Sequence, residues 1–134
     1  MISSLLLRVS LILLLCGLAL GMGMGMEQNF LLAPAHAHLN LVGFVTMFLA
    51  GLYYRFVPEA GEGTLAKVQA GFHIASAIVF PVGIAAVLTQ GPGFELAAVI
   101  GGMLVIIAML LFTIIVFRTT AARQSLTGKL APAE

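Results

Sequence analysis

Residues 34–57, PAHAHLNLVGFVTMFLAGLYYRFV, decide the fold. As a helix, this run is long enough to cross the roughly 30 Å apolar layer of a bilayer, and it begins with proline, which suits a first helical turn. Comparable apolar runs predict helices over about residues 2–24, 64–89 and 94–117. The sequence therefore predicts a single all-α domain over residues 1–134. It is a polytopic membrane protein with four transmembrane helices and a polar tail, residues 119–134, that is expected to fray.

The composition and the charge distribution agree with a membrane protein. Of the 134 residues, 61 % are hydrophobic and 8 % are charged, which excludes an ordinary soluble domain. The formal net charge of +1 gives no sign of a nucleic-acid partner. All six Lys and Arg residues fall on the side that would hold both termini, so the positive-inside rule places both termini in the cytoplasm. We expect a bacterial inner-membrane protein whose first apolar run is a retained helix rather than a cleaved signal peptide.

Two histidines, His36 and His38, lie just inside the outer end of the second predicted helix, and Asn40 follows them. Histidine is costly in lipid and is usually kept there for ligation, proton traffic or a buried partner. Positions i and i+2 differ by about 200° around a helix, so the two rings should face nearly opposite sides. Neutral imidazoles suit haem iron, copper or zinc, and haem is favoured because it takes one axial histidine from each side. The alternative is an interfacial pair wetted by headgroup water.

The remaining histidine, His73, lies on the third predicted helix at a different depth. In an apolar core of about 30 Å, the depths of His38 and His73 differ by roughly 13 Å. That is too far for the two axial ligands of one upright haem. Three roles remain open for His73: a hydrogen bond to a backbone carbonyl, a contact with a haem substituent, or a place in a second metal site. His36 of a neighbouring protomer is then the expected partner of His38, which predicts a head-to-tail ring with haem at each interface.

Methionine alternates with glycine over Gly21–Met26, at the outer end of the first predicted helix. Thioethers favour Cu(I), so a copper relay is one interpretation of this run, and a close-packing helix end is the other. Gly17, Gly21 and Gly25 repeat at the GxxxG spacing, which favours tight contact with another helix. Pro81 should kink the third helix or loosen its hydrogen bonds, which would widen a cofactor slot.

The stretch over residues 34–59 resembles two helices in the catalytic subunit of the haem-copper oxidase superfamily, nitric-oxide reductases especially. The second helix of that subunit is matched by His38-Leu39-Asn40, Tyr53-Tyr54 and Pro58-Glu59. The tenth helix of the subunit carries a His-x-His-Leu motif, which is matched by His36-Ala37-His38-Leu39. The family's twelve helices form three arcs of four around a pseudo-threefold axis, with haems toward the outer face. The resemblance implies that this chain is one arc, that a homotrimer rebuilds the whole, and that His38 and His36 correspond to ligands of different haems.

One departure from that family concerns catalysis. The oxidases hold their catalytic copper or iron partly through a histidine pair on a third-type helix, where this chain has only His73. We therefore expect haem b bound across protomers by His36 and His38, with Asn40 beside them and His73 as a further candidate metal ligand. Such a protein would serve electron transfer with a donor or acceptor, or haem storage or sensing, and no catalytic residue is assigned. The alternatives are a minimal oxidase or nitric-oxide-reductase-like enzyme, a copper-handling protein, and a cofactor-free subunit of a larger oxidase.

Overall fold

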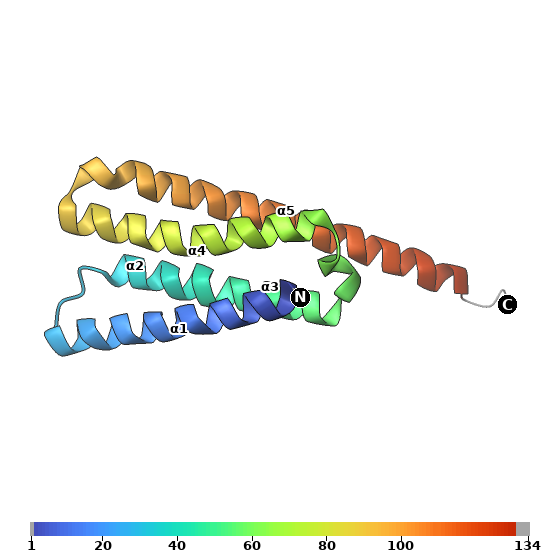
Figure 1. Cartoon of the computed structure of the whole chain (residues 1–134), viewed down its shortest axis with the longest axis horizontal. Coiled ribbons are helices and arrows are strands. Elements are labelled where there is room, and N and C mark those ends of the chain that lie inside the picture. Colours follow the sequence, from blue (N-terminus) through green and yellow to red (C-terminus); the bar gives the residue numbers. More distant parts are fainter. Residues whose placement is uncertain (1, 131–134) are drawn as a thin grey trace.

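The computed structural model describes residues 2–130 and, within them, the side chains of residues 2–125. Four helical spans are long and apolar enough to cross a membrane, which confirms the predicted all-α membrane fold. The elements are α1 (Ile2–Glu27), α2 (Ala33–His38), η1 (Leu39–Thr46), α3 (Met47–Phe56), η2 (Pro58–Gly61), α4 (Thr64–Gln90), η3 (Pro92–Phe94) and α5 (Glu95–Leu130). The second span thus consists of α2, η1 and α3 in succession (Figure 1).

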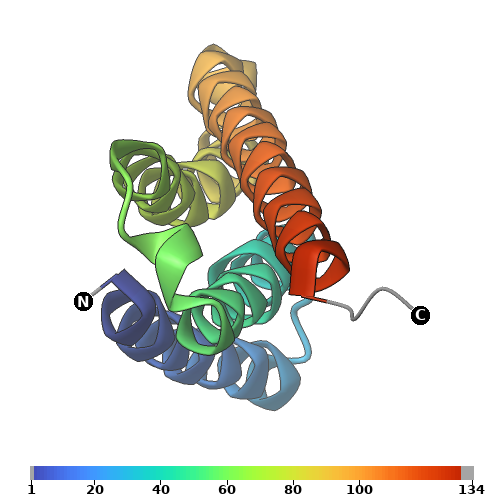
Figure 2. The ribbon, with the colours of Figure 1, turned by 90° about the vertical axis from the view of Figure 1, so that its right-hand side faces the viewer.

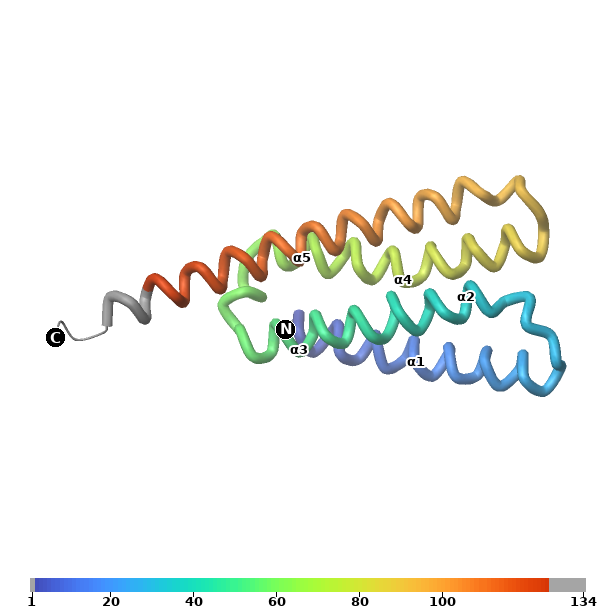
Figure 3. The backbone as a smooth tube through the Cα atoms, turned by 180° about the vertical axis from the view of Figure 1, so that it is seen from behind, coloured from blue at the N-terminus to red at the C-terminus, as the bar shows by residue number. Residues whose placement is uncertain are grey.

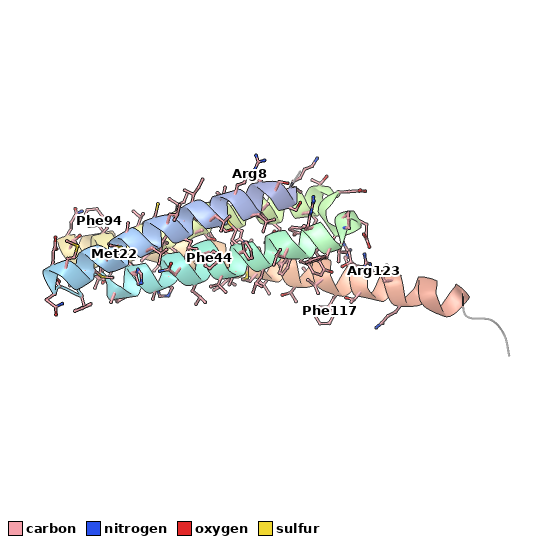
Figure 4. The ribbon with its side chains drawn as sticks, turned by 90° about the horizontal axis from the view of Figure 1, so that it is seen from below. Arg8, Met22, Phe44, Phe94, Phe117 and Arg123 are labelled. Carbon is pink, nitrogen blue, oxygen red and sulfur yellow. The ribbon has the colours of Figure 1, made fainter. Side chains whose placement is uncertain are left out.

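The spans run antiparallel and form two hairpins, α1 with α2–η1–α3 and α4 with α5 (Figures 1 and 3). Seen end-on, the second span lies beside both α1 and α4, and α5 packs along α4 (Figure 2). At the aromatic end of the second span α5 meets that span too, because Phe112 contacts the rings of Tyr53 and Tyr54 and the Thr119 hydroxyl bonds to that of Tyr53. The second span therefore contacts all three of the others. Arg8 and Arg123 lie in the half of the bundle that holds the N-terminus, and Met22 and Phe94 in the other half (Figure 4).

The second span is not a continuous α-helix, because η1 (Leu39–Thr46) is a π-helix. A π-helix bonds i to i+5 rather than i to i+4, and such segments are rare and frequent at functional sites. The sequence pattern did not predict it. Since η1 begins directly after His38, it separates the two histidines from the aromatic end of the span at Tyr53 and Tyr54.

The helices α4 and α5 are packed backbone to backbone through two glycines. A Cβ on Gly101 would lie 2.5 Å from the Cα atom of Phe80, and one on Gly83 would lie 2.5 Å from the backbone nitrogen of Ala98. Small residues allow this close approach, which is a common way to associate helices in lipid. The contact at Gly101 fixes the backbone of Phe80, whose ring contacts His38.

The last helix extends well past its predicted end near residue 117, because α5 continues to Leu130. The expectation of a frayed tail from residue 119 is therefore wrong for the described part, and residues 131–134 lie outside the described residues. Good helix formers such as Ala121 and Ala122 favour the extension. An ion pair joins it to η2, with Arg123 Nε 2.6 Å from Glu59 Oε1.

Candidate functional site

The last residue of α2, His38, lies toward α4 and has a defined tautomer. Its Nδ1 atom is 2.7 Å from the carbonyl oxygen of Pro34, one turn earlier. A carbonyl only accepts, so Nδ1 carries the proton and the neutral ring keeps its lone pair on Nε2. The ring packs edge-on against Phe80, with ring centroids 4.6 Å apart and planes at 70°. Metal-bound histidines are commonly held in this way, through the ring nitrogen that does not bind the metal.

The other histidine of the pair, His36, lies toward α1 and is half-buried. A Cβ on Gly21 would lie 2.9 Å from its Cε1 atom. The side-chain nitrogen of Asn40 is 3.3 Å from Nδ1 and 3.2 Å from Nε2 of His36, and 3.0 Å from the His36 carbonyl oxygen. An amide nitrogen only donates, so it engages whichever ring nitrogen of neutral His36 is unprotonated.

The GxxxG glycines of α1 make room for these polar side chains. A Cβ on Gly17 would lie 2.3 Å from Oδ1 of Asn40, whereas one on Gly25 would meet nothing within 4 Å. A close contact with another helix was predicted at Gly17 and Gly21. These two glycines leave a notch in the surface of α1, the glycine notch, and the side chains of Asn40 and His36 fill it. The rings of His36 and His38 diverge toward different helices, as their i, i+2 spacing predicts, and do not face a common point.

The third histidine, His73, is fully buried on α4, with 0 % of its surface exposed. Its Nε2 atom lies 3.1 Å from Thr46 Oγ1, and its Nδ1 atom lies 3.2 Å from the side-chain nitrogen of Gln69. His73 is roughly two turns, or about 10 Å, along α4 from Phe80, the residue that meets His38, so the two histidines lie at different depths. Sequence reasoning missed both partners: Gln69 lies four residues earlier on α4 itself, where the i, i+4 spacing could have indicated it, whereas Thr46 depends on how η1 and α4 are packed.

No group of three His, Cys, Asp or Glu side chains that could hold a metal ion occurs within the described residues. The methionines of the Gly21–Met26 run also point different ways, because Met22 and Met26 are exposed and Met24 is buried. Their thioethers do not converge on one position.

An apolar groove of about 220 Å³ opens over the face of α2 that lies between the two histidines. Ala35 and Leu39 form its floor, Leu20 of α1 lines one side, and Pro81 and Ala85 of α4 line the other. The helix α4 is continuous through Pro81, which contributes to the groove without ending the helix. The groove is smaller than the 300–1,000 Å³ typical of small-molecule sites.

Comparison of the chain with protein-family models, with curated proteins and with solved structures found no match. A functional assignment therefore depends on the fold and on the geometry around His36, Asn40 and His38.

Proposed function

We propose that this chain binds b-type haem within the membrane, with His38 as an axial ligand. The observation that carries the proposal is the 2.7 Å contact between Nδ1 of His38 and the Pro34 carbonyl, which leaves the Nε2 lone pair for a metal. Haem brings its own equatorial nitrogens and needs only axial ligands from the protein. Copper and zinc ions favour three or four converging protein ligands, and no such group occurs among the described residues.

The second axial ligand in this proposal is His36 of an adjacent copy, in a homotrimer with haem at each interface. Within one chain, His36 and His38 lie toward different helices, so one chain does not direct both at one iron. The groove beside them is small for a cofactor, and walls from a second copy would enlarge it. A homotrimer of four-span chains is also what the resemblance to the haem-copper oxidases implies.

When bound, haem would supply one-electron redox chemistry. The chain's own residues would hold and tune it: the Pro34 carbonyl orients His38 and raises its basicity as a ligand, and Asn40 controls whether His36 is available. Two histidine ligands would suit electron transfer with a donor or acceptor, or haem storage or sensing. We place this activity in the bacterial inner membrane with both chain termini in the cytoplasm, as the positive-inside rule predicts.

One observation favours a second candidate, a minimal oxidase or nitric-oxide-reductase-like enzyme. The Asn40 amide lies within 3.3 Å of both ring nitrogens of His36. If His36 keeps that hydrogen bond, the iron retains an open position at which a small gas molecule could bind.

Absorption spectra of the purified protein, oxidised and reduced, with and without CO, test both candidates. We expect one haem for each protomer, no response to CO, loss of haem in His38→Ala, and a CO-sensitive five-coordinate haem in His36→Ala. Met22→Leu is the matched control, since it leaves both histidines and changes only an exposed thioether. A CO response in the unaltered protein would favour the enzyme, whereas a colourless or copper-only preparation would overturn the haem proposal.

A further inference from the structure

We propose that His73 is a positioning residue for His38, because it links α4 to the π-helix η1 through a one-way chain of hydrogen bonds that begins in the buried interior. The chain of bonds sets the rotation of η1 and, with it, that of α2, on which His38 stands. The functional half of this inference rests on the proposed haem site. Its structural half can be tested in protein without haem.

The direction of every bond in this chain follows from which atoms can donate. Tyr54 donates its hydroxyl to Gln69 Oε1 at 3.0 Å, since a carbonyl oxygen only accepts. The Gln69 amide nitrogen must then donate to Nδ1 of His73 at 3.2 Å, which leaves the proton of neutral His73 on Nε2. Nε2 donates to Thr46 Oγ1 at 3.1 Å, and the Thr46 hydroxyl donates to the Val42 carbonyl at 3.0 Å.

Burial makes the Tyr54, Gln69 and His73 members of the chain depend on one another, whereas Thr46 is half-buried. Gln69 and His73 have 0 % of their surface exposed, and Tyr54 has 3 %. A polar group that loses its partner in the apolar interior cannot turn to water instead, so the loss carries the full cost of an unpaired buried group. The Tyr54–Gln69–His73 part of the chain is therefore retained or lost largely as a unit, and Thr46 is its link to η1.

The far end of the chain lies on the π-helix, since Val42 and Thr46 both belong to η1 (Leu39–Thr46). Conversion of η1 to an α-helix would replace i to i+5 bonds by i to i+4 bonds and so rotate the residues before it relative to those after it. The residue immediately before η1 is His38. A bond that holds Thr46 against α4 therefore also determines which way His38 faces.

The same helix, α4, contacts the second span at two levels. His73 bonds to Thr46 at the inner level, and Phe80 packs against His38 about 10 Å farther out. The backbone of Phe80 is in turn held by the close approach of Gly101 on α5. Because Phe80 is held independently, release of Thr46 from His73 should shift His38 relative to a fixed ring.

The decisive comparison is Thr46→Val against Thr46→Ser, in haem-free protein in lipid nanodiscs. Valine has nearly the shape of threonine and replaces the hydroxyl by a methyl group, which breaks the bonds to His73 and to the Val42 carbonyl, whereas serine keeps the hydroxyl and lacks the methyl. We expect Thr46→Val to speed amide hydrogen exchange over residues 39–46 about tenfold, the equivalent of one buried hydrogen bond. We also expect the ring-proton resonances of His38 to move toward those of Phe80→Leu, which lacks the aromatic ring. Thr46→Ser should match the unaltered protein in both measurements.

If the valine variant does not fold, Thr46→Ala replaces it in the comparison with Thr46→Ser, because alanine also lacks the hydroxyl. The inference is overturned if the hydroxyl-deleted variant and Thr46→Ser give the same exchange rates and the same His38 resonances. With haem bound, the midpoint potential should differ between Thr46→Val and Thr46→Ser. A colourless unaltered protein would refute the haem proposal alone, since the His38 resonances would still decide whether the Thr46 hydroxyl, which joins His73 to η1, positions His38.

Discussion

The glycine notch on α1 makes a sharp prediction about Asn40, which Gly17→Ala tests. The new Cβ would lie 2.3 Å from Oδ1, 2.8 Å from Cγ and 2.9 Å from Nδ2 of Asn40, so the whole amide must move. Moving it breaks the contacts of Nδ2 with the ring and the carbonyl of His36. Two hydrogen bonds at about 1 kcal/mol each amount to about 2 kcal/mol, and alanine returns about 0.5–1 kcal/mol through its better helix propensity. The net loss of stability should be about 1–1.5 kcal/mol.

Equilibrium unfolding in mixed micelles measures this difference, with Gly25→Ala as the control. Gly25 lies on the same helix, and a Cβ there would meet nothing within 4 Å, so its substitution should be neutral or slightly stabilising. The ¹⁵N resonances of His36 should change in Gly17→Ala and stay constant in Gly25→Ala, because only the former displaces the Asn40 amide. Equal stability changes in the two variants, with the His36 resonances unaffected in both, would show that the Asn40 amide does not pack against Gly17.

Three further predictions concern other contacts of the bundle. Gly101→Leu should separate α4 from α5 and cost about 2 kcal/mol or more, since even a Cβ at that position would lie 2.5 Å from backbone; reduced thermal stability would show it. The ion pair with Arg123 lowers the pKa of Glu59, so its small contribution to stability is present at neutral pH and is lost as the pH falls through that lowered pKa. Glu59→Gln should abolish this acid dependence in unfolding curves, and an unchanged dependence would contradict the assignment. Tyr54→Phe should cost about 1–3 kcal/mol, because the Gln69 carbonyl is left buried without a donor, and denaturant unfolding would measure it.

Local patterns in the sequence were sufficient to predict the spans and the divergence of the two histidines. Apolar runs of sufficient length have few alternatives to a membrane helix, and the angle between His36 and His38 depends only on their spacing. The depth difference between His38 and His73 followed from helix rise in the same way. These predictions held because each depends on a single helix or on the common thickness of the bilayer.

The features that sequence reasoning missed depend on contacts between helices. The π-helix η1 has no recognised local signal, and the side-chain partner of its Thr46, His73, lies on another helix. The GxxxG spacing indicated a close contact at Gly17 but not that a side-chain amide would fill it. The extension of α5 past residue 117 is likewise supported from outside, by the pairing of Arg123 with Glu59 on η2.

The polar residues of the second span contact two neighbouring helices, α1 and α4, each at two positions. His36 and Asn40 meet the glycine notch of α1, His38 meets Phe80 of α4, and Thr46 meets His73 at a deeper level. A single structural purpose, such as pinning two helices together, would need only one of these contacts. The Nδ1 atom of His38 donates to the Pro34 carbonyl, which leaves the Nε2 lone pair of that ring for an external ligand. The Pro34 carbonyl and the Phe80 ring both contact that imidazole, so His38 is the side chain on which the proposed haem site depends.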